Sequence, residues 1–338
     1  MDSIASQPFT VGLVQMQMAA DPAVNLRRAR DFVAAAAAAG AQVVCLPEMY
    51  RSRYFCQQED PAAFDLAEAL DGPSTRAFRT IAKARRITVI VPIFERRAPG
   101  LYHNSLAVCT PDGRLAAHYR KMHIPDDPAY FEKYYFAPGD RGFQAVDTPV
   151  GPIGALICWD QWYPEAARLT ALQGAQVLFY PTAIGWHPAE KAQFGAVQHD
   201  AWRTIQRSHA IANGVYVAAV NRVGFEPRGG DAAGAVGGSA TAGIEFWGRS
   251  FLCDPFGEVL AEAPADGETI LYSAVDPQRI EAVRRNWPFL RDRRIDAYGG
   301  LTARFLDGDL DPPPPPPPPP PARGTGRDRS TSPRRRRR

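Results

Sequence analysis

The sequence lacks the features that mark membrane-spanning, secreted and zinc-binding proteins. No apolar run among its 338 residues approaches the roughly 18 residues that a membrane-spanning helix requires. Residues 1–10 have no basic start followed by an apolar core, so no secretory signal is predicted. The five cysteines are scattered and odd in number, and they form neither a CxxC pair nor a zinc-ligand spacing. We therefore expect a cytoplasmic protein with reduced thiols and no disulfide framework.

Positive charge exceeds negative charge only at the end of the chain. The formal net charge is +3, but residues 322–338 hold eight Arg and one Asp and contribute +7, which leaves −4 for residues 1–321. A nucleic-acid partner is therefore indicated by the tail alone. Residues 312–321 are ten consecutive prolines, which form extended polyproline. We predict that this Pro-rich and Arg-rich tail is disordered.

Short apolar runs alternate with helical patterns along the rest of the chain. Strand-like runs cover residues 9–16, 42–47, 88–94, 153–157, 176–181 and 214–221. Helical patterns cover residues 21–40, 74–86, 165–173 and 194–213, and hairpin signals cover 104–119 and 250–262. This order predicts an α/β protein in which mixed sheets are covered by outer helices.

One cysteine stands at a promising position. Cys158 directly follows the apolar run 153–157, and Pro164 then opens a predicted helix. A thiol near a helix N-terminus can have a lowered pKa, and the thiolate is the nucleophile. A thiol in apolar surroundings is more often a small buried hydrophobe, and Cys45 and Cys253 are interpreted in that way.

A cysteine nucleophile needs a base and a positive group, and the sequence offers both at comparable positions. Glu48 follows the apolar run 42–47, and Lys121 follows the hairpin 104–119. We expect these side chains to meet Cys158 at one edge of the sheets. Taken singly, each has an ordinary alternative, since such residues commonly cap an element or lie at the surface.

The segments around these three residues resemble a known family. LPEMYRSRYF contains Glu48, YRKMHIPDD contains Lys121 and GALICWDQWYPEAARL contains Cys158. In this order they are similar to the three signature segments of the nitrilase (carbon–nitrogen hydrolase) superfamily. The segments YPTAIGW and NRVG fit the same family. The resemblance covers residues 8–298, which we expect to form one domain, and it leaves residues 299–338 as a C-terminal extension.

The resemblance implies a four-layer α-β-β-α sandwich and a catalytic triad that uses no metal and no cofactor. It assigns Glu48 as the general base, Cys158 as the nucleophile and Lys121 as the group that stabilises the tetrahedral intermediate. It makes the backbone N–H of Trp159 a second oxyanion donor. It also indicates Glu132 as a further carboxylate of the site, with an exposed loop residue as the alternative. Because superfamily members commonly pair or assemble further, we expect a homo-oligomer.

Within the superfamily, CWDQWYPEAARL and TAIGWHPAEK are most similar to the N-carbamoylputrescine amidases. These enzymes hydrolyse N-carbamoylputrescine to putrescine, carbon dioxide and ammonia in polyamine synthesis. Relatives that cleave N-carbamoyl amino acids tend to carry basic residues shortly after the nucleophile, where this chain has Gln161 and Trp162. The nearby charges are acidic, namely Asp160, Glu165 and Glu190. This pattern predicts a small-molecule substrate with a cationic amine end.

The predicted substrate contacts are aromatic and acidic side chains near these motifs: Tyr54, Tyr130, Trp159, Asp160, Trp186 and Glu190. For Asp160 a capping role stays open, and for Trp186 a place in the core or in a subunit interface. His187 is interpreted as a loop residue rather than a base.

Other functions stay open at this point. Within the superfamily the alternative is a β-ureidopropionase-like hydrolase of N-carbamoyl amino acids or an aliphatic amide hydrolase. A second class is a binding protein that acts through the basic, Pro-rich tail. A third is a thiol-redox protein, which needs a resolving cysteine near Cys158, and none is close in sequence.

Overall fold

The computed structural model describes residues 7–229 and 242–306 of the chain. The chain divides into two units, residues 1–291 and 292–338. In the second unit the described residues form two short turns of 3₁₀ helix, Ile295–Ala297 and Gly299–Thr302. The proline run and the arginine-rich end, for which disorder is predicted, lie outside the described residues. The predicted domain boundary at residue 298 stays a prediction.

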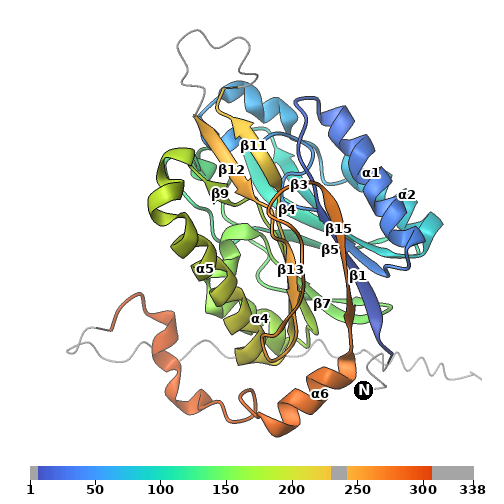
Figure 1. Cartoon of the computed structure of the whole chain (residues 1–338), viewed down its shortest axis with the longest axis vertical. Helices are drawn as coiled ribbons and strands as arrows, with labels where there is room; N and C mark the ends of the chain where they lie inside the picture. The colour runs from blue at the N-terminus through green and yellow to red at the C-terminus, as the bar shows by residue number, and fades with distance from the viewer. Residues whose placement is uncertain (1–6, 230–241, 307–338) are drawn as a thin grey trace, which may run out of the picture. The chain divides into compact units, whose positions relative to one another are not determined.

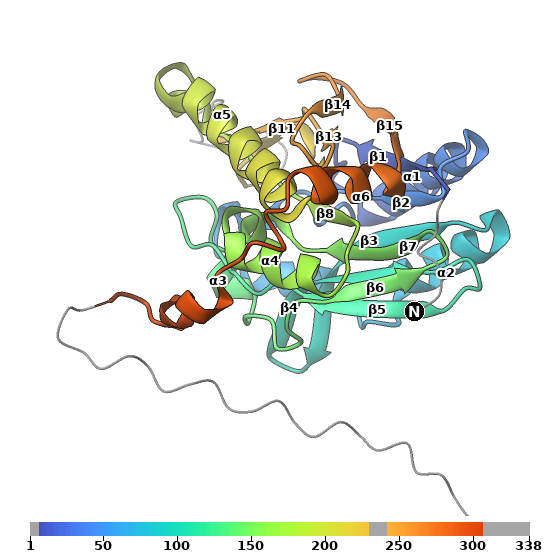
Figure 2. The same cartoon turned by 90° about the horizontal axis from the view of Figure 1, so that it is seen from below.

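Two six-stranded mixed sheets organise the first unit (Figures 1 and 2). The first sheet has the order β15 (Thr269–Val275), β1 (Phe9–Gln15), β2 (Val43–Cys45), β3 (Thr88–Ala98), β4 (Leu101–Cys109) and β5 (Leu115–Arg120). The second has the order β14 (Val259–Glu262), β13 (Phe251–Cys253), β10 (Tyr216–Val220), β8 (Val177–Pro181), β7 (Gly151–Ala155) and β6 (Ala145–Thr148). The strands β1, β2 and β3 are parallel, as are β7, β8 and β10, and antiparallel strands flank both sets.

Helices cover the outer face of each sheet. Helices α1 (Pro22–Ala38) and α2 (Pro73–Arg85) pack on the first sheet, and α4 (Pro164–Leu172) and α5 (Pro188–Asn213) pack on the second (Figures 1 and 2). A further helix, α6 (Pro277–Asn286), follows β15. The layers therefore follow the order helix, sheet, sheet, helix, and the predicted four-layer α-β-β-α sandwich is confirmed.

The alternation of side chains along β1 explains how one strand serves two layers. Val11 and Leu13 belong to the core between the two sheets, whereas Val14 belongs to the core under α1 and α2. Successive side chains of a strand point to opposite faces, so an apolar strand between two layers is buried on both. Helix α1 begins where predicted, because Asp21 caps it by accepting a hydrogen bond from the N–H of Ala23 at 2.7 Å.

Some elements differ from the sequence-based prediction. Helix α5 begins at Pro188, six residues before the predicted start. The prediction missed its first turns because they are exposed and show no apolar periodicity. A third, three-stranded sheet, β11 (Val223–Pro227), β12 (Gly243–Trp247) and β9 (Gly185–Trp186), was not predicted. The loop expected at 122–142 contains a short helix, α3 (Glu132–Tyr135).

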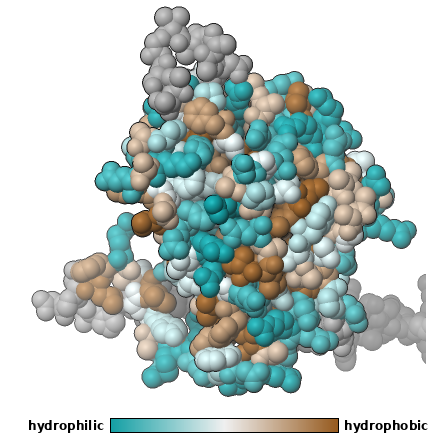
Figure 3. All heavy atoms as spheres, viewed as in Figure 1, coloured by the Kyte–Doolittle hydropathy of each residue, from teal (hydrophilic) through white to brown (hydrophobic). Residues whose placement is uncertain are grey.

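The surface carries both hydrophobic and hydrophilic side chains. On the face seen in Figure 3, hydrophobic side chains lie among hydrophilic ones. Among residues 7–229 and 242–306, we find no helix with the length and apolar character that crossing a membrane requires.

Candidate active site

The three residues expected to act together do lie together. Glu48 comes after β2 and Lys121 after β5, both in the first sheet, and Cys158 comes after β7 in the second. The ammonium of Lys121 donates a hydrogen bond from Nζ to Glu48 Oε1 at 2.9 Å. The charges of Glu48 and Lys121 both act on the thiol of Cys158. The strand ends of the two facing sheets thus form one site.

Lys121 is held between two buried carboxylates. Its Nζ also donates to Glu132 Oε2 at 2.6 Å, so one ammonium bridges Glu48 and Glu132. Two neutral donors complete the arrangement: Asn104 Nδ2 donates to Glu48 Oε1 at 2.7 Å, and the hydroxyl of Tyr54 donates to Glu132 Oε1 at 2.8 Å. All five residues are at most 2% exposed.

Burial and neighbouring charges set the protonation of this cluster. Burial lowers the pKa of Lys121, but its interactions with Cys158, Glu132 and Glu48 outweigh this effect, and the pKa lies well above its ordinary value. Burial raises the pKa of Glu132, with Lys121 opposing and Glu48 adding to the increase. Lys121 is therefore a permanent cation of the site.

One carboxylate oxygen of the cluster has no partner. Glu48 Oε2 is buried, and within the described part of the chain no group forms a hydrogen bond to it. The other oxygen, Oε1, accepts from both Lys121 and Asn104. A buried carboxylate oxygen without a donor is an unused proton acceptor. It can accept a proton from a neighbouring group without breaking an existing hydrogen bond.

The thiol of Cys158 is buried, and its pKa is raised. Cys158 has a φ of +44° and begins a five-residue 3₁₀ helix, Cys158–Trp162, that precedes α4. Burial raises the pKa of the thiol and the Glu48 carboxylate adds to this, whereas Lys121 opposes it. The expectation that the nearby helix start lowers this pKa is corrected, because desolvation in a site with two carboxylates dominates. The thiol needs a base to react.

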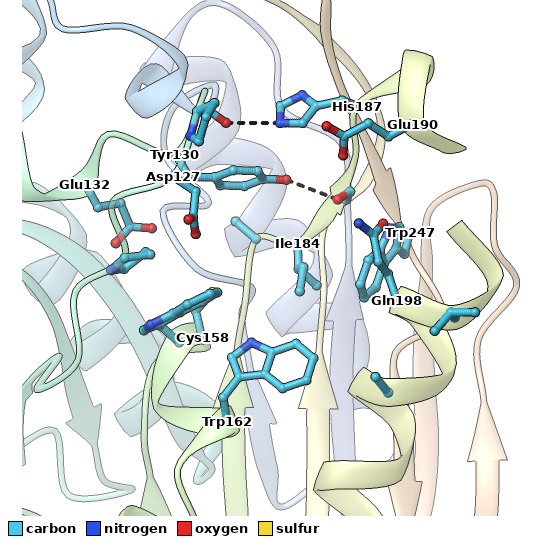
Figure 4. A pocket seen from close by; sticks show the side chains of 17 residues that line it. Asp127, Tyr130, Glu132, Cys158, Trp162, Ile184, His187, Glu190, Gln198 and Trp247 are labelled. Atoms are coloured by element: carbon cyan, nitrogen blue, oxygen red, sulfur yellow. Dashed lines mark hydrogen bonds between the residues drawn. The ribbon is translucent and has the colours of Figure 1, made fainter. Parts of the chain in front are cut away.

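A cavity of about 480 Å³ opens beside the thiol (Figure 4). Cys158 and Glu132 lie on one side of it, and Glu190 and Gln198 lie on the other. The ionisable side chains among its lining residues are three acids, a thiol, a tyrosine and a histidine: Asp127, Glu132, Glu190, Cys158, Tyr130 and His187. No Lys or Arg belongs to the described residues that line it. The electrostatic character of the cavity therefore favours a positively charged guest.

Three of the six predicted substrate contacts line this cavity, namely Tyr130, Trp159 and Glu190. Tyr54 lies against Tyr130, with ring centroids 5.6 Å apart, and reaches the site through its hydrogen bond to Glu132. His187, interpreted as a loop residue, precedes α5 and also lines the cavity, where its Nε2 lies 3.1 Å from the carbonyl oxygen of Pro128.

The other two predicted contacts lie elsewhere. The Asp160 side chain is fully buried, and its carboxylate accepts hydrogen bonds from four donors of the protein. Trp186 packs on Trp247 with ring centroids 5.4 Å apart and donates from Nε1 to the carbonyl of Gly195 at 3.0 Å. Neither Asp160 nor Trp186 lines the cavity, so the structure does not bring these two predicted contacts to it.

A buried arginine, not predicted as a site residue, holds the loop that carries Glu48. Arg222 is fully buried and donates to the carbonyl oxygens of Glu48, Met49 and Ser52. It also pairs with Glu226 at 2.8 Å. Its segment NRVG matched the family, but nothing in the sequence shows that its guanidinium points to the loop after β2. Asp127 and Asn104 were likewise missed, since a lone polar residue in a loop or strand gives no signal.

The described residues contain no group of three or more His, Cys, Asp and Glu side chains arranged to hold a metal ion.

Comparison with known proteins identifies relatives of the whole fold. The carbon–nitrogen hydrolase family model matches residues 10–285. The chain is 40% identical over 300 residues to the N-carbamoylputrescine amidase of Solanum lycopersicum, covering 88% of this chain and 96% of that one. It is 36% identical to the citrullinase of Francisella tularensis, covering 87% and 98%. The crystal structure of a carbon–nitrogen hydrolase from Helicobacter pylori superposes with a TM-score of 0.82 at 44% identity, covering 89% and 100%.

Proposed function

The chain belongs to the carbon–nitrogen hydrolase family and is an amide-hydrolysing enzyme, and from this premise we propose that it hydrolyses N-carbamoylputrescine. The products are putrescine, carbon dioxide and ammonia, which places the reaction in polyamine biosynthesis. The observation that carries the proposal is the pairing of a buried thiol, base and ammonium with an acidic cavity. Curated N-carbamoylputrescine amidases at about 40% identity support the same activity.

The geometry supports a mechanism in two halves. In the first, Glu48 Oε2 takes the proton of Cys158, and Sγ attacks the ureido carbon. Lys121 and the backbone N–H of Trp159 stabilise the negative charge that develops on the oxygen. The proton then passes from Glu48 to the departing nitrogen, and a thioester-type carbamoyl group remains on sulfur. In the second half Glu48 activates a water molecule, which cleaves the thioester and restores the thiol, and the carbamate that is released breaks down to carbon dioxide and the remaining amine.

Glu132 has a positioning role in this proposal. Its carboxylate accepts a hydrogen bond from Nζ of Lys121 at 2.6 Å, in addition to the one that Glu48 accepts. An ammonium held by two carboxylates cannot swing away from the position at which the oxyanion forms. The proposal therefore adds Glu132 to the triad of Glu48, Lys121 and Cys158.

The far side of the cavity is proposed to bind the amine end of the substrate. Glu190 supplies negative charge there, and the cavity is also lined by Asp127 and by the aromatic ring of Tyr130. We expect Glu190→Gln to raise KM for N-carbamoylputrescine by about two- to fivefold with little change in kcat, because an exposed pair contributes roughly 0.2–1 kcal/mol. Glu165→Gln is the matched control, since Glu165 is an exposed acid outside the cavity.

Citrulline is the second candidate substrate, because a citrullinase is among the relatives. It carries the same ureido group but ends in an amine and a carboxylate. The acidic side chains of the cavity fit the amine, whereas the carboxylate meets no Lys or Arg among the described lining residues. We therefore favour N-carbamoylputrescine.

A substrate panel tests this choice. Ammonia release is measured with N-carbamoylputrescine, citrulline, N-carbamoyl-β-alanine and an aliphatic amide. We expect the highest kcat/KM for N-carbamoylputrescine. A higher kcat/KM for citrulline or for the β-alanine derivative would contradict the proposal.

Assembly and location complete the proposal. We propose a cytoplasmic homo-oligomer, as expected from the resemblance to the superfamily. Size-exclusion chromatography with light scattering measures the number of subunits, and a monomer at micromolar concentration would contradict the proposed assembly. A function of the tail in binding nucleic acid is not part of the proposal.

A further inference from the structure

We propose that Asp160 is a positioning residue that locks the segment of Cys158 to the segment of Lys121. This inference rests on the proposed function, because it assigns these two residues to the reaction. Asp160 is fully buried, two residues beyond Cys158, and its carboxylate does not reach the cavity. Its partners lie on both sides of the site, on the strand ends of two different sheets.

One of the four contacts of the carboxylate holds the turn at Cys158. The N–H of Ile157 donates to Asp160 Oδ2 at 3.0 Å, and the N–H of Asp160 donates back to the carbonyl oxygen of Ile157 at 3.0 Å. These reciprocal bonds close the turn in which Cys158 has its φ of +44°. A residue other than glycine keeps such a conformation only where the surrounding structure imposes it. The hydrogen bond to the carboxylate of Asp160 helps to hold Cys158 in this conformation.

The other three contacts of the carboxylate hold the segment of Lys121. The hydroxyl of Tyr119 donates to Asp160 Oδ2 at 2.6 Å. His123 donates to Oδ1 twice, from its backbone N–H at 3.0 Å and from Nδ1 at 2.7 Å. Tyr119 and His123 stand two residues before and two residues after Lys121. The same carboxylate therefore fixes both sides of the catalytic lysine.

A ring stack closes the same connection. The imidazole of His123 lies parallel to the ring of Tyr163, with centroids 3.7 Å apart and planes 5° apart. Tyr163 follows Asp160 by three residues, and its N–H donates to the carbonyl of Asp160 at 3.2 Å. The segments 119–123 and 157–163 are therefore joined by a carboxylate and by a stack. Their separation sets the distance between the nucleophile and the ammonium.

An amide in place of this carboxylate cannot make the same contacts. The N–H of Ile157 and the N–H of His123 both require an acceptor and bond to different oxygens of the carboxylate, whereas an asparagine offers only one acceptor oxygen. Asp160→Asn keeps the size of the side chain but must release the donors on one oxygen. Because a displacement of about 1 Å can cost about 100-fold in rate, we expect kcat to fall by about that factor, with KM changed less than threefold.

The matched control is a second buried aspartate. Asp254 is 3% exposed and accepts hydrogen bonds from the N–H groups of Phe256 and Glu258, at 2.8 and 2.9 Å, in the turn between β13 and β14. Asp254→Asn removes a carboxylate of the same burial that takes no part in the site. We expect it to lower the unfolding temperature and to leave kcat within about twofold of the wild type.

Alkylation of Cys158 by iodoacetamide gives a readout that needs no substrate. Its rate, followed by peptide mass spectrometry at fixed pH, is expected to fall at least tenfold in Asp160→Asn and to stay unchanged in Asp254→Asn. Equal kcat values and equal alkylation rates in the two folded variants would overturn the proposal. If the substrate is not N-carbamoylputrescine, only the turnover assay has to change, because the alkylation assay uses no substrate. The proposed substrate and the proposed role of Asp160 can therefore fail separately.

A milder variant covers the case in which Asp160→Asn does not fold. Tyr119→Phe removes one of the four donors and leaves an apolar ring of the same shape. We expect it to fold, to lower kcat several-fold and to slow alkylation of Cys158 by a similar factor. An unchanged kcat together with an unchanged alkylation rate would overturn the proposal.

Discussion

Replacing Lys121 with methionine is expected to destabilise the fold as well as to abolish activity. The ammonium bridges Glu48 and Glu132, and all three residues are at most 1% exposed. Methionine fills a similar volume but leaves two buried carboxylates without a cation. Removing one partner of a buried ion pair costs about 3–5 kcal/mol in the free energy of unfolding. For a domain of this size the unfolding temperature then falls by on the order of 10 °C.

The loss of stability is expected to depend on pH. Without Lys121, burial and the charge of Glu48 are no longer opposed, and they raise the pKa of Glu132 in the folded state above the value of about 4.3 in the unfolded chain. The folded variant then binds protons more tightly than the unfolded chain, so its stability falls as the pH rises from the unfolded pKa through the folded one. The difference from the wild type is therefore larger at pH 8 than at pH 5.

Urea unfolding at both pH values measures this prediction. The double variant Lys121→Met/Glu132→Gln has one buried carboxylate fewer and is expected to recover part of the stability at pH 8 but no activity. Lys191→Met is the control, because the pair of Lys191 with Glu245 is exposed at 44% and 38% and contributes at most about 1 kcal/mol. If Lys121→Met were as stable as Lys191→Met at pH 8, the reasoning would be refuted.

Three further changes test neighbouring parts of the account. Arg222→Met is expected to cost about 3–5 kcal/mol in urea unfolding, because a buried cation that holds the loop after β2 is lost, and a cost below 1 kcal/mol would contradict this. Tyr54→Phe removes a hydrogen bond that lowers the pKa of Glu132, so the acid limb of the kcat profile is expected to move to higher pH; an unmoved limb would argue against a role for that carboxylate. Burial raises the pKa of Glu95, but hydrogen bonds, foremost from Arg120, hold it well below its usual range. The stability that Glu95 contributes is therefore present above about pH 4.3 and is lost as the pH falls below that value. In urea unfolding, Glu95→Gln should be less stable than the wild type at neutral pH, and this difference should shrink as the pH falls below about 4.3. A difference that is constant with pH would contradict the prediction.

The meeting of the three central residues could be predicted from the sequence. Apolar runs before Glu48 and Cys158 mark buried strands, and the ends of these strands, which lie in two facing sheets, meet at the site. The family resemblance of the motifs around these residues implied a second sheet and outer helices, and the structure contains both. These features depend on apolar periodicity and on local sequence, which are visible without coordinates.

The direction of individual side chains could not be predicted. Asp160 reads as part of an acidic rim because it stands beside the nucleophile, but the left-handed turn at Cys158 directs its carboxylate into the protein. Trp186 reads as a substrate contact, yet it stands in a two-residue strand of a small sheet that carries no periodic signal. The pKa of the thiol follows from burial beside two carboxylates, and burial is a property of the assembled fold.

The most direct test of the central claim is to trap the intermediate on sulfur. The enzyme is mixed with N-carbamoylputrescine, quenched in acid within one turnover and measured by intact-protein and peptide mass spectrometry. The account predicts an added carbamoyl group, alone or still bearing the diamine, on the peptide that contains Cys158, and no such adduct in Cys158→Ser. Turnover by Cys158→Ser at the wild-type rate, or an adduct on a different residue, would contradict it.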